Sequence, residues 1–153
     1  IISAIKIQAK DTIVPPAADT WYSFKFDTLL ANETIGTDFT WPVDNDSTKV
    51  MVNEEGLYFI GSNIHFQDTN VGNTWRVVFS RTLINGVEFP GMQASWRGYA
   101  PYEAFHNANS SVYCAANDTL ELQFNTNRTS IIFMTNPVFD YRAAATLWLF
   151  RIK

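Results

Sequence analysis

One stretch of the chain concentrates the side chains that most often make contacts in binding sites. Between Ala94 and Asn107 the sequence reads ASWRGYAPYEAFHN. Trp, Tyr and Arg dominate binding hot spots, and stacked aromatic rings also bind the apolar faces of sugars. The candidate ligand contacts are Trp96, Arg97, Tyr99, Tyr102 and His106. The stretch therefore predicts a recognition surface. Its alternative is a set of rings that fills an interface or closes one end of the fold.

Acidic side chains alternate in the run Asp44-Asn45-Asp46-Ser47, an arrangement whose oxygens suit hard cations. The run has neither the glycine nor the distal glutamate of an EF-hand loop, so we interpret it as a solvated turn. Calcium held through Asp44 and Asp46 is the weaker alternative. His65 and His106 are far apart in the sequence and do not have the spacing of a zinc site. We therefore expect no metal and no other cofactor.

The usual sequence signatures of catalysis do not occur. There is no G-x-S-x-G elbow, no glycine-rich phosphate loop and no recognisable Cys-His pairing. Cys114 is the single cysteine, and its apolar flanks indicate a buried small hydrophobe without a disulfide. Paired carboxylates of a glycosidase are defined by their separation in space, so that alternative stays open. We predict that the protein is not an enzyme.

The composition indicates a single globular domain. The 153 residues carry a formal net charge of −4 and 46% apolar residues, with twelve Phe, six Tyr and five Trp. No basic face predicts nucleic-acid binding, and no apolar run reaches the length needed to insert into a membrane. The chain starts with Ile-Ile-Ser instead of Met. We expect one domain over 1–153, in which 1–19 forms an N-terminal strand and a linker to an upstream region.

The elements that must position these residues are short strands, because the dominant hydrophobic period is two. Leu120, Leu122 and Phe124, for example, alternate with polar residues, and turn signals such as Asn85-Gly86 separate the apolar runs. No long segment has a helical stripe. The expected strands are 2–8, 21–27, 37–42, 56–67, 74–84, 87–95, 109–116, 118–125, 130–135 and 144–152. Such regular short strands predict an all-β sandwich or barrel.

The order of several short motifs resembles the C1q-like family, a relative of the tumour-necrosis-factor jelly roll. The motifs span about residues 20–153 and are listed here in chain order: FDTLLAN at 26–32, FTWP at 39–42, GLYFI at 56–60, Ile84-Asn85-Gly86, the strand from Ser110 through the turn Ala116-Asn117-Asp118, and ATLWLF at 145–150. Two departures are Asn117 where the family usually has glycine and a longer stretch between Pro42 and Gly56. No collagen repeat precedes the domain.

The resemblance implies a ten-stranded jelly-roll sandwich that assembles as a homotrimer. Strands that are apolar on both faces also favour assembly, because one internal core serves only one face. The closing strand places Leu147 and Leu149 on one face and Trp148, Phe150 and Ile152 on the other. We expect Trp148, Phe150, Ile152 and Phe105 to lie in the trimer interface. The alternative is that loops cover the outer face of this strand.

Together these features predict a trimeric recognition head that binds a cell-surface receptor or carbohydrate. The absence of collagen and disulfides, with Asn/Thr-rich turns, favours the tip of a viral or phage fibre or spike, located extracellularly or on the virion surface. A structural trimerisation cap or capsid decoration module is one alternative. A secreted animal C1q-like ligand or lectin is another, and a collagen or coiled-coil segment upstream would distinguish it.

Overall fold

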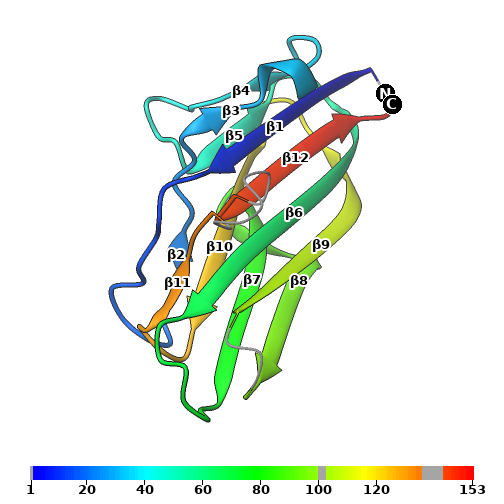
Figure 1. Cartoon of the computed structure of the whole chain (residues 1–153). Helices are drawn as coiled ribbons and strands as arrows, with labels where there is room; N and C mark the ends of the chain where they lie inside the picture. Colours follow the sequence, from blue (N-terminus) through cyan, green and yellow to red (C-terminus); the bar gives the residue numbers. More distant parts are fainter. Residues whose placement is uncertain (1, 100–102, 136–142) are drawn as a thin grey trace.

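The computed structural model describes residues 2–99, 103–135 and 143–153, and shows two antiparallel sheets packed face to face (Figure 1). Within those residues the only helical element is a short 3-10 turn, η1 (Ala31–Glu33). Sheet A contains β1 (Ser3–Ala9), β3 (Thr28–Leu29), β6 (Gly56–Asp68), β9 (Glu103–Cys114), β11 (Ile131–Phe133) and β12 (Ala145–Arg151). Sheet B contains β2 (Tyr22–Ser23), β4 (Phe39–Thr40), β5 (Lys49–Val52), β7 (Arg76–Ile84), β8 (Val87–Gly98) and β10 (Thr119–Thr126). The all-β sandwich predicted from the period-two patterns is confirmed.

The strand order places the first and last strands side by side. Sheet A runs β9-β6-β12-β1-β3, and β11 pairs with the last residues of β6. Sheet B runs β8-β7-β10-β5-β4, and β2 also pairs with β10. The backbone N–H of Ile2 donates to the carbonyl of Arg151 at 2.8 Å. Both chain ends therefore leave the sandwich together, at the end opposite the loop that joins β6 to β7 (Figure 1).

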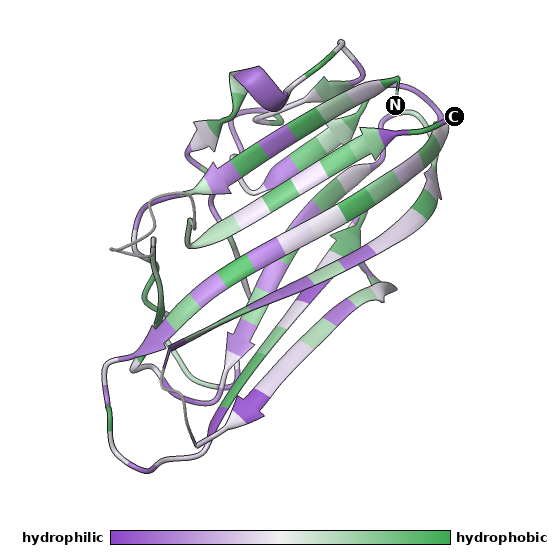
Figure 2. Ribbon diagram, turned by 45° about the vertical axis from the view of Figure 1, so that its right-hand side comes forward, coloured by the Kyte–Doolittle hydropathy of each residue, from purple (hydrophilic) through white to green (hydrophobic). Residues whose placement is uncertain are grey.

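The core fills the space between the two sheets. Apolar and polar bands alternate along the strands (Figure 2), as in β10, where Leu120, Leu122 and Phe124 are buried. Phe124 lies at the centre of an aromatic cluster, with ring centroids 4.4 Å from Phe133 and 4.7 Å from Phe24. Such offset and tilted ring pairs add to the stabilisation that burial alone provides.

The turns expected from Asn and Gly have the left-handed backbone that these residues tolerate. Asn85 and Gly86 have φ of 52° and 77°, as a two-residue hairpin between β7 and β8 requires. Asn117 has φ of 72° in the turn before β10. Asp44 and Asn45 have φ of 49° and 64° and form the tip of a tight turn closed by Val43 and Asp46. The turns predicted from these residues are thus present in the structure.

Three predicted segments differ from the structure. The strand expected at 21–27 is shortened to β2, because after Ser23 the chain leaves sheet B and runs, with Phe24 and Phe26 buried, to β3 in sheet A. The long loop expected after Pro42 contains β5, which pairs with β10. The strand expected at 109–116 begins at Glu103, because the thirteen-residue β6 offers a partner along the whole of β9.

Candidate recognition surfaces

The aromatic segment that the sequence singled out forms the ends of two strands instead of one continuous loop. Trp96 and His106 point inward, since they pair with the core residues Val78 and Ile64. Both rings contact Phe66, with centroid distances of 5.4 Å for Trp96 and 5.8 Å for His106. These two residues close the space between the edge strands β8 and β9. Their placement favours the packing alternative over a ligand contact.

His106 behaves as an apolar ring in this position. Burial lowers the pKa of His106 to about 4, so the imidazole is neutral at pH 7. Its two ring nitrogens have no hydrogen-bond partner among the described residues. Cys114 is likewise fully buried, and burial raises the pKa of its thiol to about 11. Both groups are therefore uncharged at pH 7.

The other predicted contact residues divide between the surface and the segment outside the described residues. Arg97 points outward from β8, and its guanidinium carbon lies 5.5 Å from the centroid of the Phe79 ring. Tyr99 is 53% exposed, and its ring centroid is 5.1 Å from that of Trp75. Tyr102 lies outside the described residues. The structure therefore leaves Arg97 and Tyr99 accessible but does not gather all five candidates into one site.

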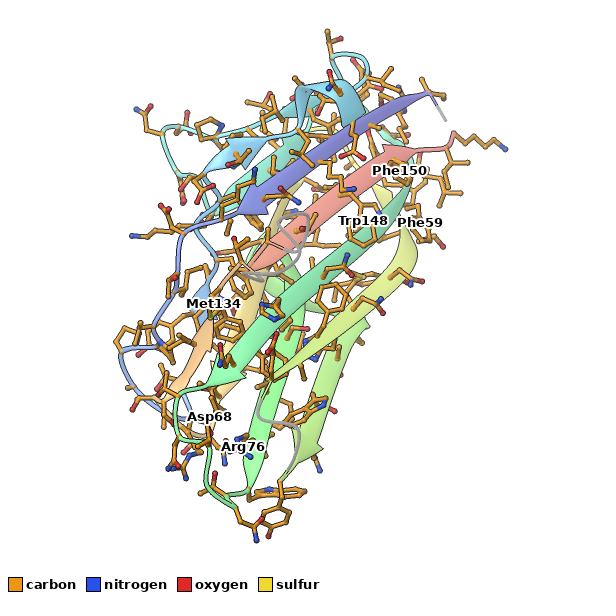
Figure 3. The ribbon with its side chains drawn as sticks, in the orientation of Figure 1. Phe59, Asp68, Arg76, Met134, Trp148 and Phe150 are labelled. Carbon is orange, nitrogen blue, oxygen red and sulfur yellow. The ribbon has the colours of Figure 1, made fainter. Side chains whose placement is uncertain are left out.

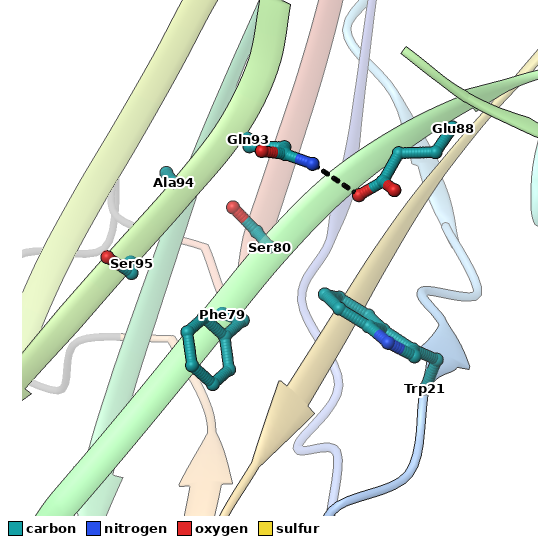
Figure 4. Close-up of a pocket in the computed structure, with 7 residues that line it drawn as sticks. All are labelled: Trp21, Phe79, Ser80, Glu88, Gln93, Ala94 and Ser95. Carbon is teal, nitrogen blue, oxygen red and sulfur yellow. Dashed lines mark hydrogen bonds between the residues drawn. The ribbon is translucent and has the colours of Figure 1, made fainter. Parts of the chain in front are cut away.

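A cavity of about 390 Å³ opens on the outer face of sheet B (Figure 4). Trp21 and Phe79 supply its aromatic walls, while Ser80, Glu88, Gln93 and Ser95 supply hydroxyl, carboxylate and amide groups. The cavity forms where β8 bulges. Ser80 pairs with Ala94 and Thr82 pairs with Phe89, so residues 90–93 stand opposite the single residue Arg81. This size and mixed lining are typical of small-molecule sites.

Hydrogen bonds and a stacked cation hold the aromatic wall in place. The guanidinium carbon of Arg81 lies 4.0 Å from the Trp21 ring centroid, and its Nε donates to Gln123 Oε1 at 2.9 Å. Gln123 Nε2 donates to Ser23 Oγ at 3.1 Å, and the Ser23 hydroxyl donates to the Glu121 carboxylate. The indole is thus positioned by a connected polar network on β7, β10 and β2.

The residues that line this cavity are not among those predicted from the sequence. Trp21, Phe79 and Glu88 come from three separate segments, so no local motif joins them. One signal was present in the sequence: Pro90-Gly91 interrupts an otherwise regular strand. Pro and Gly inside a strand pattern indicate a bulge, and bulges often adjoin functional sites.

The outer face of sheet A carries a strip of aromatic side chains, which we call the sheet A strip and define as Phe59, Trp148 and Phe150. The three rings lie together on β6 and β12 (Figure 3), and Phe59 stacks on Phe150 at a centroid distance of 6.2 Å. Each is only half-buried in the single chain. Leu147 and Leu149 face the core, so the predicted division of β12 into two apolar faces is confirmed. Ile152 is 46% exposed beyond β12, and Phe105 lies on β9 opposite His65.

A glycine allows Trp148 to lie flat on the sheet. A Cβ atom added at Gly61 would stand 1.9 Å from Trp148 Cε2 and 2.0 Å from Cζ2. No side chain larger than hydrogen fits between the β6 backbone and this ring. The sheet A strip is therefore flat as well as apolar, as a contact surface between chains requires.

The acidic run does not gather ligands for a cation. The Asp46 carboxylate accepts from the Thr48 backbone N–H at 2.9 Å and the Thr48 hydroxyl at 2.6 Å, and lies 3.8 Å from Lys49 Nζ. These hydrogen bonds hold the pKa of Asp46 below its usual value. Across the part of the chain that the structure describes, no three His, Cys, Asp or Glu side chains form a group suited to a metal ion. In the same residues no helix is long and apolar enough to cross a membrane.

The fold is that of a tumour-necrosis-factor-like jelly-roll sandwich. Among solved structures it is similar to the crystal structure of murine APRIL at pH 8.5, with a TM-score of 0.59 over 98% of each chain. The two sequences are only 9% identical, so this likeness concerns the fold alone. No protein-family model and no curated protein sequence matches the chain.

Proposed function

We propose that the chain is a non-enzymatic recognition head that assembles as a homotrimer and binds a cell-surface receptor or carbohydrate. The observation that carries this proposal is the sheet A strip, three half-buried aromatic rings on the outer face of a jelly-roll sheet. Exposed apolar patches with a flat surface mark sites of protein association. The similarity of the fold to a tumour-necrosis-factor-family protein also supports it.

In the proposed trimer each strip packs against a neighbouring chain about a three-fold axis. Trp148 and Phe150 form its centre, and Ile152 and Phe105 lie at its two ends. Aromatic residues are enriched in interface cores, where they bury a large area at low conformational cost. The outer face of sheet B then points away from the interface. The cavity beside Trp21 stays open in the assembled head, which favours recognition over a purely structural cap.

The finer part of the proposal is that the head forms the tip of a viral or phage fibre or spike. One feature supports it: both chain ends lie at the same end of the sandwich (Figure 1). A shaft joined there leaves the opposite end and the sheet B cavity free to meet a target. The expected location is accordingly extracellular or on the virion surface.

Light scattering coupled to gel filtration tests the assembly. The expected mass is three times 17.4 kDa at micromolar concentration. Trp148→Glu places a charge in the centre of the strip and should reduce the mass to that of one chain. Val77→Glu, a matched change on the outer face of sheet B, should leave the trimer intact. A wild-type protein that stays monomeric, or a trimer insensitive to Trp148→Glu, contradicts the proposed interface.

Binding of the labelled trimer to a panel of cells and to a printed glycan array tests recognition. Saturable binding to one of them is the expected result. A stable trimer that binds neither surface would instead support the structural cap that the sequence left open.

A further inference from the structure

We propose that the cavity between Trp21 and Phe79 binds a sugar ring that carries a carboxylate. This inference rests on the proposed recognition function and assigns it a site and a ligand class. The shared chemistry is a pyranose with one carboxylate, which uronic acids and sialic acids both provide. Three features of the cavity support it: the aromatic walls, the hydrogen-bonding groups opposite them and the charges at its two ends.

The aromatic walls fit the apolar face of a pyranose. Trp21 and Phe79 are half-buried, with ring centroids 6.5 Å apart and planes inclined at 47°. The two rings thus form an open angle, with the indole held from behind by Arg81 at 4.0 Å. The C–H groups of a sugar ring are electropositive and pack against the electron-rich faces of such rings. Neither aromatic side chain is needed in the core, since both point out of sheet B.

The far side of the cavity supplies hydrogen-bonding groups for hydroxyls. Gln93 Nε2 donates to Glu88 Oε1 at 2.6 Å across the bulge (Figure 4), which fixes both side chains. The second carboxylate oxygen of Glu88 and the amide oxygen of Gln93 can accept from sugar hydroxyls, and Ser95 can donate or accept. A cavity of about 390 Å³ is large enough for a sugar ring with its substituents.

The charges around the cavity orient an acidic ligand. Gln93, Ser95 and Arg97 alternate along the outer face of β8, so Arg97 lies toward one end and Glu88 toward the other. Arg97 lies over Phe79 and has no ion-pair partner within the described residues. The Glu88 carboxylate repels a ligand carboxylate, whereas the Arg97 guanidinium binds it through charge-assisted hydrogen bonds. A carboxylated sugar therefore has one favoured orientation, and a neutral sugar lacks the Arg97 contact.

The test titrates the trimer with two acidic sugars and one neutral sugar, of which the glucuronide and the glucoside differ only in the carboxylate at C6. The probes are methyl β-D-glucuronide, the methyl α-glycoside of N-acetylneuraminic acid, and the neutral methyl β-D-glucoside. Binding is followed by NMR through the indole N–H signal of Trp21, which Trp21→Phe identifies. At least one acidic probe should shift this signal saturably and bind about tenfold or more tightly than the glucoside, as expected for one charge-assisted hydrogen bond. The probe that binds distinguishes the uronic-acid source from the sialic-acid source.

Two variants and one matched control complete the test. Arg97→Ala should weaken the acidic probe about tenfold and leave the glucoside unchanged. Trp21→Ala removes the indole signal, so this variant is titrated by calorimetry beside the wild type, and binding of every probe should be abolished. Lys25→Ala removes an exposed positive charge outside the cavity and should have no effect. Equal binding of acidic and neutral probes, no binding by wild type, or binding that survives Arg97→Ala and Trp21→Ala would each overturn the inference.

The outcome separates this inference from the proposed function. Each variant is also measured by light scattering and by cell or array binding. A trimer that still binds cells after Trp21→Ala overturns the sugar site and leaves the recognition head standing. A wild-type chain that binds the acidic probes as a monomer instead contradicts the proposed trimer and supports the site.

Discussion

Arg76 and Asp68 form an ion pair that the fold buries completely (Figure 3). Arg76 Nε lies 2.7 Å from Asp68 Oδ2, and the two side chains are 1% and 0% exposed. The remaining guanidinium N–H groups donate to the carbonyl oxygens of Asn70, Gly72, Thr74 and Tyr99. A single side chain thus joins the loop between β6 and β7 to the end of β8. Burying a charged group costs free energy because the group loses its hydration. The ion pair and the hydrogen bonds of Arg76 offset this cost.

Removing Arg76 should therefore destabilise the protein strongly. Arg76→Ala leaves the buried Asp68 carboxylate with only Arg128, whose Nε is 3.7 Å away, as an ion-pair partner, and it removes the guanidinium donors of the Asn70, Thr74 and Tyr99 carbonyl groups. We expect a loss of about 3–5 kcal/mol in urea unfolding. Lys6→Ala is the matched control, because its ion pair with Glu33 at 3.3 Å is on the surface and contributes less than about 1 kcal/mol. Equal losses for the two variants would contradict this account of the pair.

The same pair should make the protein sensitive to acid. Burial alone would raise the pKa of Asp68, but hydrogen bonds from the Asn70 backbone N–H and Arg76 outweigh it, so the pKa lies below the usual value. A carboxyl with a lowered folded pKa stabilises the fold above its unfolded pKa of about 3.9, and this stability is lost as the pH falls through the folded value. Asp68→Asn should be less stable at pH 7 yet lose less stability between about pH 4 and pH 2. Denaturant unfolding at stepped pH measures both effects.

His106 should also make the stability depend on pH, but at higher pH values than Asp68 does. Its folded pKa of about 4 is below the unfolded value of about 6.5, so the unfolded chain takes up the proton first. Stability should fall as the pH drops from about 6.5 to about 4, by up to about 3 kcal/mol, and no further below that. His106→Phe should remove this slope and leave two fewer unpaired buried nitrogens. A slope that persists between these pH values in the variant would show that another group titrates there.

Gly61→Ala should displace Trp148 from sheet A. The added Cβ would stand 1.9 Å from the indole, and overpacking of this kind costs about 1–3 kcal/mol. The ring lies on the outer face of sheet A and is not fully buried, so it can move away while the core stays folded. Circular dichroism should therefore remain that of a β protein while light scattering shows loss of the trimer. Gly72→Ala is the control, because the nearest atom to its added Cβ is a loop side-chain oxygen at 3.1 Å. Retention of the trimer by Gly61→Ala would place the interface elsewhere.

The fold could be predicted because the patterns that indicate it lie within short stretches of the sequence. Alternating apolar residues fix which face of each strand meets the core, as in Leu120–Phe124, and Asn85-Gly86 fixes one hairpin through its positive φ angles. The division of β12 into Leu147 and Trp148 faces follows from the same period. The strand predictions were wrong in segments whose structure depends on pairing with strands that are distant in the sequence. Two-residue strands such as β2 and β3 exist only because β10 and β1 offer them partners.

The candidate site was less predictable because it depends on distant residues. Phe79 lies within a predicted strand and Trp96 directly follows one, yet Trp96 points inward and Phe79 outward. The bulge at Pro90-Gly91 changes the register of β8 and so decides which side chains line the cavity. Trp21 reaches that cavity only because β2 pairs with β10, which no pattern within residues 20–25 indicates.

The position of β12 has a consequence for how the protein is made. This strand is the last of those in the described residues, yet it lies in the middle of sheet A, between β6 and β1, and pairs with residues 3–9 and 58–64. During synthesis on the ribosome, β1 and β6 are therefore made before β12, the strand that pairs with both of them. Sheet A is completed only after β12 has been synthesised, so the sheet cannot close before that point, and a truncation that removes β12 would leave a gap at the centre of the sheet.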